Sequence, residues 1–143
     1  TGIMKLFDND DQVAVVMGHE TGHVVARHAA ERYSQSQAAG LGISIASVAV
    51  GGNAGAQVGD VLGMGVSLGV LLPFSRRHES EADRLGLEYC RRAGFDPRQA
   101  IPFWERMEAK GGSRPPEFLS THPDPETRIA RIKAQLRAMG YSV

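Results

Sequence analysis

Most of the chain has the apolar and polar spacing of helices, and no stretch has a convincing strand pattern. Residues 9 to about 35 follow an amphipathic helical pattern. Asp8, Asn9 and Asp10 precede it as candidate N-caps, and their charge suits the start of a helix. A second helical pattern runs from about 76 to 93. These patterns predict a mainly α fold.

Capping signals mark the remaining helices. Gly94 suits the position after a helix end, and Asp96 with Pro97 suits the start of a third helix, which we expect to end at Gly111–Gly112. A proline-rich loop covering residues 111–124 follows. The pair Asp124–Pro125 repeats the start signal for a last helix that runs to about Met139. The apolar residues expected to pack these two helices are Ile101, Phe103, Trp104, Met107, Ile129, Ile132, Leu136 and Met139.

Residues 38–73 have a different composition from the rest. They form two apolar, glycine-rich halves separated by a polar break with Asn53, Gln57 and Asp60. Neither half reaches the roughly 18 to 20 residues that a helix needs to span a bilayer. Three interpretations stay open: a buried helical hairpin, a mobile flap over a cleft, or a segment that touches a membrane surface.

The first predicted helix carries the pattern H-E-x-x-H, from His19 to His23. Residues four apart lie on one helix face, so both imidazoles can reach one metal ion. Neutral imidazole suits Zn²⁺, and Glu20 would then lie beside the metal as a general base for a bound water. The alternative is a structural histidine pair. Gly18 and Gly22 form a smooth stripe where another helix can approach closely.

A catalytic zinc site needs a third protein ligand. Glu79 and Asp83 are four residues apart in the second predicted helix and share a face. One carboxylate could bind zinc while the other accepts the second ring N–H of a histidine ligand, which fixes its tautomer. Glu81 projects away from that face and is expected to be a solvated charge. The alternative is a surface network of these acids with the neighbouring arginines.

Composition narrows the class of protein. The 143 residues suffice for one domain with a core of its own, and the formal net charge is zero. Basic residues are mixed with acids and aromatics are sparse, so nothing suggests a nucleic-acid partner. Cys90 is the single cysteine, which excludes an internal disulfide, and we expect it to be a small buried residue.

Three ordered motifs resemble one family. They are H-E-x-x-H at 19–23, S-R-x-x-E-x-x-A-D at 75–83, and S-T-H-P-x-P-x-x-R at 120–128. Together they resemble the zinc metallopeptidases that include the CAAX prenyl protease, HtpX and BepA. The resemblance extends over nearly the whole chain. It implies a zincin fold of the gluzincin type, mainly α here and α+β in the full-length protein, whose helices carry H-E-x-x-H and E-x-x-A-D.

The resemblance implies a role for each matched residue. His19, His23 and Glu79 would bind one Zn²⁺ per chain, Glu20 would be the general base, and Asp83 would support a ligand. His122 matches a histidine near the active site, which in BepA-like members approaches the zinc and holds the enzyme inactive; the alternative is a turn residue. Arg128 matches a residue that would contact substrate or the transition state, or would be a helix-surface charge.

The resemblance also implies an extended stretch that ends near Thr1–Gly2 and forms the edge of a sheet at the cleft. Here the chain begins inside it, so we expect residues 1–143 to be a single catalytic domain that lacks its N-terminal portion, with 38–73 as a hairpin or flap. The bacterial cell envelope is the expected compartment. Composition does not fix the compartment, and no sequence signal fixes the oligomeric state.

The function expected from the sequence is zinc-dependent hydrolysis of peptide bonds in misfolded or envelope proteins. One alternative is a zinc-binding chaperone or scaffold in which His122 fills the open metal position. The others are a zinc hydrolase acting on a non-peptide amide and a metal-free helical interaction protein.

Overall fold

The computed structural model describes residues 3–110, 122 and 127–143, and no strand occurs among them. The order is η1 (Ile3–Leu6), α1 (Asp10–Val25), α2 (His28–Val50), α3 (Gly52–Val66), the π-helical turn η2 (Ser67–Leu71), α4 (Leu72–Arg92), η3 (Pro97–Gln99), α5 (Ala100–Lys110) and α7 (Arg128–Ala138). The mainly α fold class is therefore confirmed.

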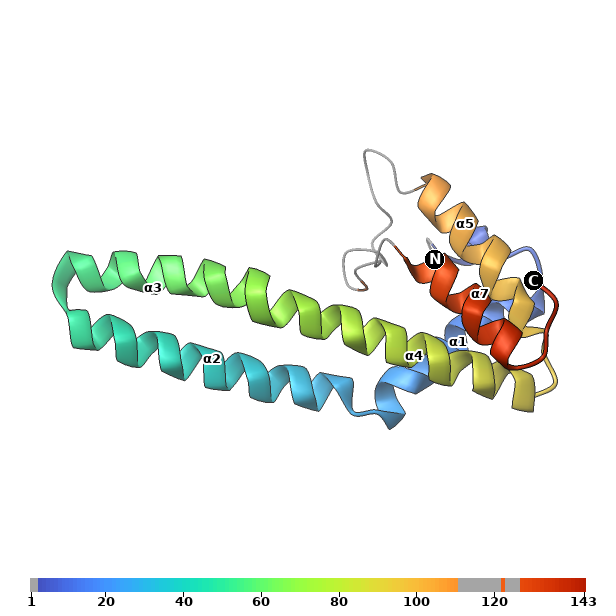
Figure 1. The fold of residues 1–143 in the computed structure, drawn as a ribbon, viewed down its shortest axis with the longest axis horizontal. Coiled ribbons are helices and arrows are strands. Elements are labelled where there is room, and N and C mark those ends of the chain that lie inside the picture. Colours follow the sequence, from blue (N-terminus) through green and yellow to red (C-terminus); the bar gives the residue numbers. More distant parts are fainter. Residues whose placement is uncertain (1–2, 111–121, 123–126) are drawn as a thin grey trace. The chain divides into compact units, whose positions relative to one another are not determined.

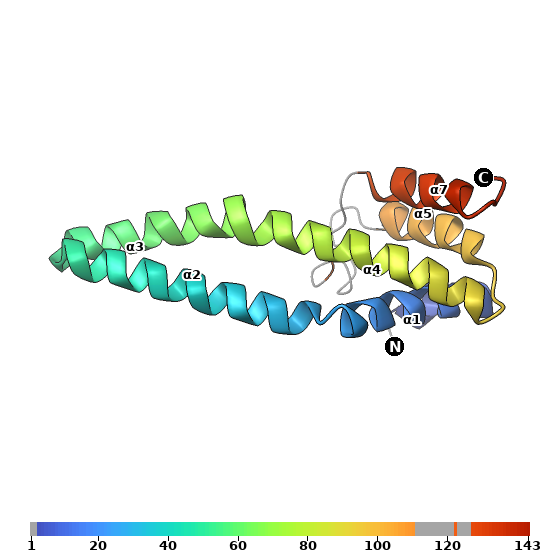
Figure 2. The same ribbon diagram turned by 60° about the horizontal axis from the view of Figure 1, so that its bottom comes forward.

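The helices form two compact units. The core unit comprises Thr1–Ala26 and His78–Val143, and the hairpin unit comprises Arg27–Arg77. The core unit buries a single apolar cluster drawn from η1, α1, α4, α5 and α7: Leu6, Val15, Val16, Leu87, Cys90, Ala100, Phe103, Trp104, Met107, Ile132 and Leu136. Figure 2 shows α5 and α7 side by side. The predicted apolar faces of these two helices are confirmed, with Ile101, Ile129 and Met139 partly buried against the cluster.

Local capping signals locate most helix ends. The side chain of Asn9 accepts a hydrogen bond from the backbone N–H of Gln12 at the start of α1. The side chain of Asp96 accepts one from the N–H of Arg98 at the start of η3. After α4, Gly94 adopts φ +85°, and the N–H of Phe95 returns to the carbonyl of Cys90 at 3.1 Å. The predicted ends at Gly111–Gly112 and Asp124–Pro125 lie outside the described residues.

The first helix prediction was wrong in extent. The predicted helix over 9–35 is interrupted, because α1 ends at Val25 and α2 begins at His28. Arg27 between them adopts the left-handed region, with φ 57° and ψ 32°. A left-handed residue ends the repeating hydrogen-bond pattern of a right-handed helix, and an arginine there carries no sequence signal of the kind that glycine or asparagine would. The boundary between the two units falls at this break.

Glycines set the contact between α1 and α4 within the core unit. A Cβ added to Gly18 would lie 2.7 Å from the carbonyl oxygen of Gly86, and one added to Gly22 would lie 2.9 Å from that of Ala82. Gly86 approaches in return, since its added Cβ would lie 2.6 Å from the backbone nitrogen of His19. The close approach predicted at Gly18 and Gly22 is confirmed. This packing brings residues of the two helices that are 60 positions apart into one site.

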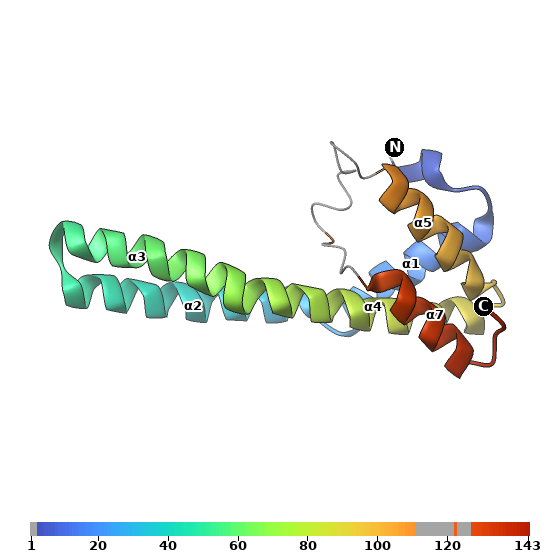
Figure 3. The same cartoon turned by 45° about the horizontal axis from the view of Figure 1, so that its top comes forward.

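The hairpin unit consists of α2, α3, η2 and the start of α4, up to Arg77. The arms α2 and α3 lie side by side in every ribbon view (Figures 1, 2 and 3) and reverse at Gly51, which has φ +75°. The polar break at Asn53, Gln57 and Asp60 falls in α3 after this turn. Many of the unit's large apolar side chains are exposed, including Val48 at 81%.

Candidate metal centre

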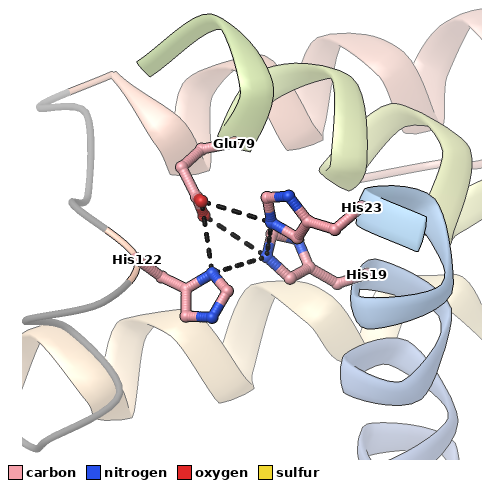
Figure 4. Close-up of side chains that lie close together, drawn as sticks. All are labelled: His19, His23, Glu79 and His122. Carbon is pink, nitrogen blue, oxygen red and sulfur yellow. Dashed lines mark hydrogen bonds and ion pairs between the residues drawn. The ribbon is translucent and has the colours of Figure 1, made fainter. Parts of the chain in front are cut away.

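Four side chains of the core unit converge on one point. Figure 4 shows His19 and His23 projecting from α1 toward Glu79 of α4, with His122 closing the fourth side. One ligand atom from each of the four lies within 4.8 Å of all the others. His19 and Glu79 are nearly inaccessible, at 2% and 0% exposed, whereas the side chains of His23 and His122 keep 13% and 16% of their surface. The cluster therefore has a buried floor and a partly open side.

The donor atoms are spaced as the ligands of a tetrahedral metal ion are. His19 Nε2 lies 3.1 Å from His23 Nε2 and 3.3 Å from Glu79 Oε2, and His23 Nε2 lies 3.2 Å from Glu79 Oε1. His122 Nδ1 lies 3.2 Å from Glu79 Oε1 and 3.4 Å from His19 Nε2. Four ligands about 2.1 Å from a central ion in tetrahedral geometry are separated by roughly 3.4 Å. The residues therefore fit a four-coordinate metal.

The chemistry of the donors supports the same conclusion. Glu79 Oε2 is buried and has no hydrogen-bond donor among the described residues, although it faces His19. Two ring nitrogens, from His19 and His23, face each other across 3.1 Å. Such a pair needs a proton or a cation between them, because two imidazole lone pairs repel one another. A divalent cation would satisfy both the carboxylate oxygen and the ring nitrogens at once.

The electrostatics of the site favour a carboxylate facing cations. Burial of Glu79 opposes its ionisation, but contacts from His122, His19 and His23 outweigh burial and hold the pKa of Glu79 far below its usual range. Burial acts to lower the pKa of His19, but its contacts with Asp83 and Glu79 more than offset this and raise that pKa overall. A divalent cation bound at the cluster would compete with protonation of His19.

A second layer of side chains supports the ligands. The ring N–H at His19 Nδ1 donates to Asp83 Oδ1 at 2.8 Å, which leaves Nε2 directed at the cluster. The same carboxylate oxygen accepts from Arg128 Nη2 at 2.6 Å. Arg128 is 1% exposed, and its Nη1 lies 3.7 Å from Glu79 Oε2. The guanidinium stacks on the ring of Trp104, with its central carbon 3.4 Å from the ring centroid.

Arg128 is buried between Asp83, Glu79 and Trp104. Arg128 thus contacts one proposed ligand, Glu79, and the carboxylate of Asp83, which supports His19. The contact with substrate or the transition state that the sequence resemblance implies for this residue stays a prediction. The stacking on Trp104 was not predicted: Trp104 was expected only to pack a helix, and its distance of 24 positions from Arg128 leaves no local sequence signal.

Glu20 and Glu81 lie where solvent reaches them. The side chain of Glu20 is 48% exposed, and its Oε1 is 3.5 Å from His122 Nε2. A carboxylate next to the cluster but outside the ligand set is suited to accept a proton from a water bound there. The side chain of Glu81 is 49% exposed and lies 3.9 Å from Arg84 on the same helix. It lies apart from the cluster, as expected for a solvated charge.

The sequence of the chain is similar to known peptidases. The model of "Peptidase family M48" matches residues 1–136. The chain is 38% identical over 137 residues to the mitochondrial metalloendopeptidase OMA1 of Schizosaccharomyces pombe, covering 94% of the chain and 39% of that relative. It is 34% identical over 148 residues to the beta-barrel assembly-enhancing protease of Escherichia coli, covering 97% and 30%. No solved structure matches the chain.

The OMA1 of Arabidopsis thaliana is 37% identical over 139 residues, which cover 97% of the chain and 27% of that relative. The chain thus spans well under half the length of these relatives.

Proposed function

Because the chain belongs to peptidase family M48, we propose that it is the catalytic domain of a zinc-dependent endopeptidase. The observation that carries the proposal is the convergence of His19, His23 and Glu79 on one point, with the carboxylate of Glu20 beside it. Two imidazoles and one carboxylate form the ligand set of catalytic zinc in several metallopeptidases. Zinc bound there would polarise the scissile carbonyl and lower the pKa of a bound water.

The protein groups have distinct tasks in this proposal. Asp83 holds His19 in the tautomer that presents Nε2 to the ligand cluster. Arg128 neutralises Asp83 and holds it in place. Its positive charge offsets the cost of burying the carboxylates of Asp83 and Glu79, which are 9% and 0% exposed. Glu20 accepts a proton from the attacking water and returns it to the leaving amine. The partly open side of the cluster, at His23 and His122, is where a peptide carbonyl would enter.

We further propose that the described conformation is a resting state. A catalytic zinc site keeps one position for water, yet His122 Nδ1 occupies the fourth side of the cluster, 3.2 Å from Glu79 Oε1. His122 Nε2 also faces Glu20 at 3.5 Å. With a metal bound, His122 would take the place of the water and would lie beside the general base. Withdrawal of His122 would open the site to water and substrate.

This placement of His122 also supports a second candidate function. A site closed by four protein ligands suits a zinc-binding module that serves as a chaperone or scaffold for envelope proteins. The two functions differ in what removal of His122 does: it activates a resting peptidase and leaves a scaffold without hydrolysis.

We propose misfolded or envelope polypeptides as substrates and the bacterial cell envelope as the compartment. Support comes from the relatives, which include bacterial beta-barrel assembly-enhancing proteases; the mitochondrial relatives support a membrane-bounded compartment more generally. Fractionation of the tagged protein from its native cell tests the compartment, and recovery in the cytosol would contradict it.

The decisive experiment combines metal content with hydrolysis of an unfolded protein. We expect about one zinc per chain by elemental analysis, and cleavage of casein that Glu20→Gln abolishes without loss of zinc. His122→Ala should cleave faster than the unmodified chain. An active, zinc-loaded Glu20→Gln variant would contradict the role of Glu20. Stoichiometric zinc without cleavage in any variant, including His122→Ala, would favour the scaffold. Glu81→Gln, which changes a carboxylate outside the cluster, is the matched control.

A further inference from the structure

The hairpin unit presents apolar side chains along its outer surface. Leu41, Ile45 and Val48 recur at four- and three-residue intervals on α2, and Val61, Met64 and Leu68 recur at three- and four-residue intervals along α3 and η2. Each of these six side chains is between 62% and 81% exposed. Their spacing places each set on one side of its helix. The unit therefore carries two long apolar stripes that nothing in the described residues covers.

Charge is nearly absent from the same surface. Between Arg32 and Arg76 the sequence contains one ionisable acid or base, Asp60, apart from the phenol of Tyr33. A helix exposed to water usually balances an apolar stripe with a charged face, whereas a helix without charge all round is typical of a protein interior or a bilayer. In addition, Gly52–Arg92 is long and apolar enough to cross a membrane, and its best 18-residue window has a mean hydropathy of 1.6 and no buried residue.

The two arms pack together through small residues. A Cβ added to Gly55 would lie 2.3 Å from the carbonyl oxygen of Ser47, and one added to Gly59 would lie 2.7 Å from Ser47 Oγ. The arms thus meet by backbone proximity and leave their large apolar side chains on the outside. This arrangement gains little from the hydrophobic effect in water but is common between helices in lipid, where close backbone packing holds helices together.

The dimensions and ends of the hairpin match a bilayer. Each apolar half is too short to span a bilayer, but the helical arms that contain them are longer. At 1.5 Å per residue, the uncharged residues 33–50 extend about 27 Å and residues 52–75, which include Asp60, about 36 Å. The hydrocarbon core of a bilayer is about 30 Å thick. Arg32, Arg76 and Arg77 follow at the open end, where basic side chains meet anionic headgroups. Tyr33 is 67% exposed beside them, as aromatic residues are at membrane interfaces.

The closed end of the hairpin is polar. Asn53, Gln57 and Asp60 are all exposed and lie four and three residues apart, so they share one face of α3 near the turn. Asn53 and Gln57 can lie among the headgroups of the far leaflet, whereas Asp60 lies about 13 Å from Gly51 along α3. The unit thus has a cationic open end, an apolar middle and a polar tip.

From these features we infer that residues 33–75 insert as a helical hairpin into a bilayer that contains anionic lipid, with the arginines at its open end on the headgroups. The inference concerns the hairpin unit alone and does not depend on the proposed peptidase activity. A second copy of this chain, or another segment of a longer protein, could also cover the stripes; these are outcomes of the experiment.

Vesicle flotation tests the inference with the full chain. We expect it to float with vesicles of 70% phosphatidylcholine and 30% phosphatidylglycerol, and less with pure phosphatidylcholine. Ile45→Lys combined with Leu68→Lys should reduce the bound fraction at least about tenfold, because both lysines would enter hydrocarbon. Met4→Lys changes an apolar residue of the core unit that is 61% exposed, and should leave binding unchanged. Equal loss in Met4→Lys, or no flotation of the unmodified chain, would overturn the inference.

Spin labels distinguish lipid from protein as the cover. Cys90 is 2% exposed, so single cysteines at Leu41→Cys or Leu68→Cys can be labelled selectively. On vesicles, each nitroxide should become more accessible to oxygen and less accessible to a water-soluble nickel complex. A label that is shielded from both reagents before vesicles are added, with no change afterwards, would show a protein contact and overturn the inference. Casein cleavage by the same samples reports separately on the peptidase.

Discussion

The two units of the chain differ in how they place their large apolar side chains. The core unit buries its apolar cluster and also charged or ligating groups, among them His19, Glu79, Asp83 and Arg128. The hairpin unit leaves its large apolar residues exposed and joins its arms through glycine and serine. The first arrangement is that of a protein stabilised in water around a polar site. No described residue of the hairpin unit belongs to the buried apolar cluster, so burial of apolar surface within this unit contributes little to its stability in water.

The largest contrast between the units should appear on truncation of apolar side chains. Phe103→Ala removes a fully buried ring of the core unit and should lower the free energy of unfolding by about 3–5 kcal/mol. Leu68→Ala removes a 62% exposed side chain of the hairpin unit. This substitution should change the free energy of unfolding by less than about 0.5 kcal/mol. Urea denaturation followed by Trp104 fluorescence measures both. A comparable loss of unfolding free energy in Leu68→Ala, measured without lipid, would show that contacts within the protein stabilise the hairpin in water.

Glycine substitutions should separate the units next. Gly22→Ala places a Cβ 2.9 Å from the carbonyl of Ala82, so α1 and α4 must move apart. We expect a loss of about 1–3 kcal/mol in stability and weaker metal binding, because His19 and Glu79 lie on the two displaced helices. Gly63→Ala meets no atom within 4 Å and should be neutral or slightly stabilising. Thermal unfolding with and without zinc is the measurement, and equal effects would contradict the close approach.

A smaller effect is expected where a supporting carboxylate is altered. Asp83→Asn keeps the shape of the side chain but removes the charge that His19 and Arg128 share. Zinc affinity should fall about 10–100-fold, as is typical for a lost partner of a metal-bound histidine. Competition with a chromogenic chelator measures it. Asp60→Asn in the hairpin unit is the matched control and should leave affinity unchanged; an unchanged affinity in Asp83→Asn would remove Asp83 from the site.

The last contrast concerns the chemistry of a buried and an exposed thiol. Burial, together with the carboxylates of Asp11 and Asp96, raises the pKa of Cys90 from 9.0 to about 11. A raised pKa means that the neutral thiol contributes stability at and below pH 9, which is lost as the pH rises toward 11. Unfolding measured across this range should show a decline that Cys90→Ala lacks.

Alkylation compares the same thiol with one in the hairpin unit. At pH 8 iodoacetamide should modify native Cys90 at least tenfold more slowly than the cysteine of Ile45→Cys, which replaces a 62% exposed residue. Mass spectrometry after timed quenching measures both rates. Equal rates would contradict the burial of Cys90.

Helix ends and the shared face of residues four apart could be predicted from the sequence, because both depend on neighbouring residues. Asn9, Gly94 and Asp96 mark helix ends by local hydrogen bonding, and the structure confirms all three. Two histidines one helical turn apart face the same way in any α-helix, so the placement of His19 and His23 followed from spacing alone. The same logic paired Glu79 with Asp83.

Long-range and unsignalled features could not be predicted. The interruption at Arg27 depends on a left-handed arginine, which no local pattern requires. The contact of Arg128 with Trp104 depends on how α5 and α7 pack, which the periodicity of either helix does not encode. The exposure of Leu41 and Val61 could not be read from their composition, because an apolar helix in a core and one in a membrane have the same sequence pattern.

The glycines between α1 and α4 have a consequence for protein design. They bind nothing, yet they set the separation of the two backbones from which the ligands project. A designer who transferred His19, His23 and Glu79 onto an ordinary pair of helices, with axes 8–10 Å apart and packed through leucine, would place correct ligands too far from one another. The transferable unit is therefore the three ligands together with Gly18, Gly22 and Gly86.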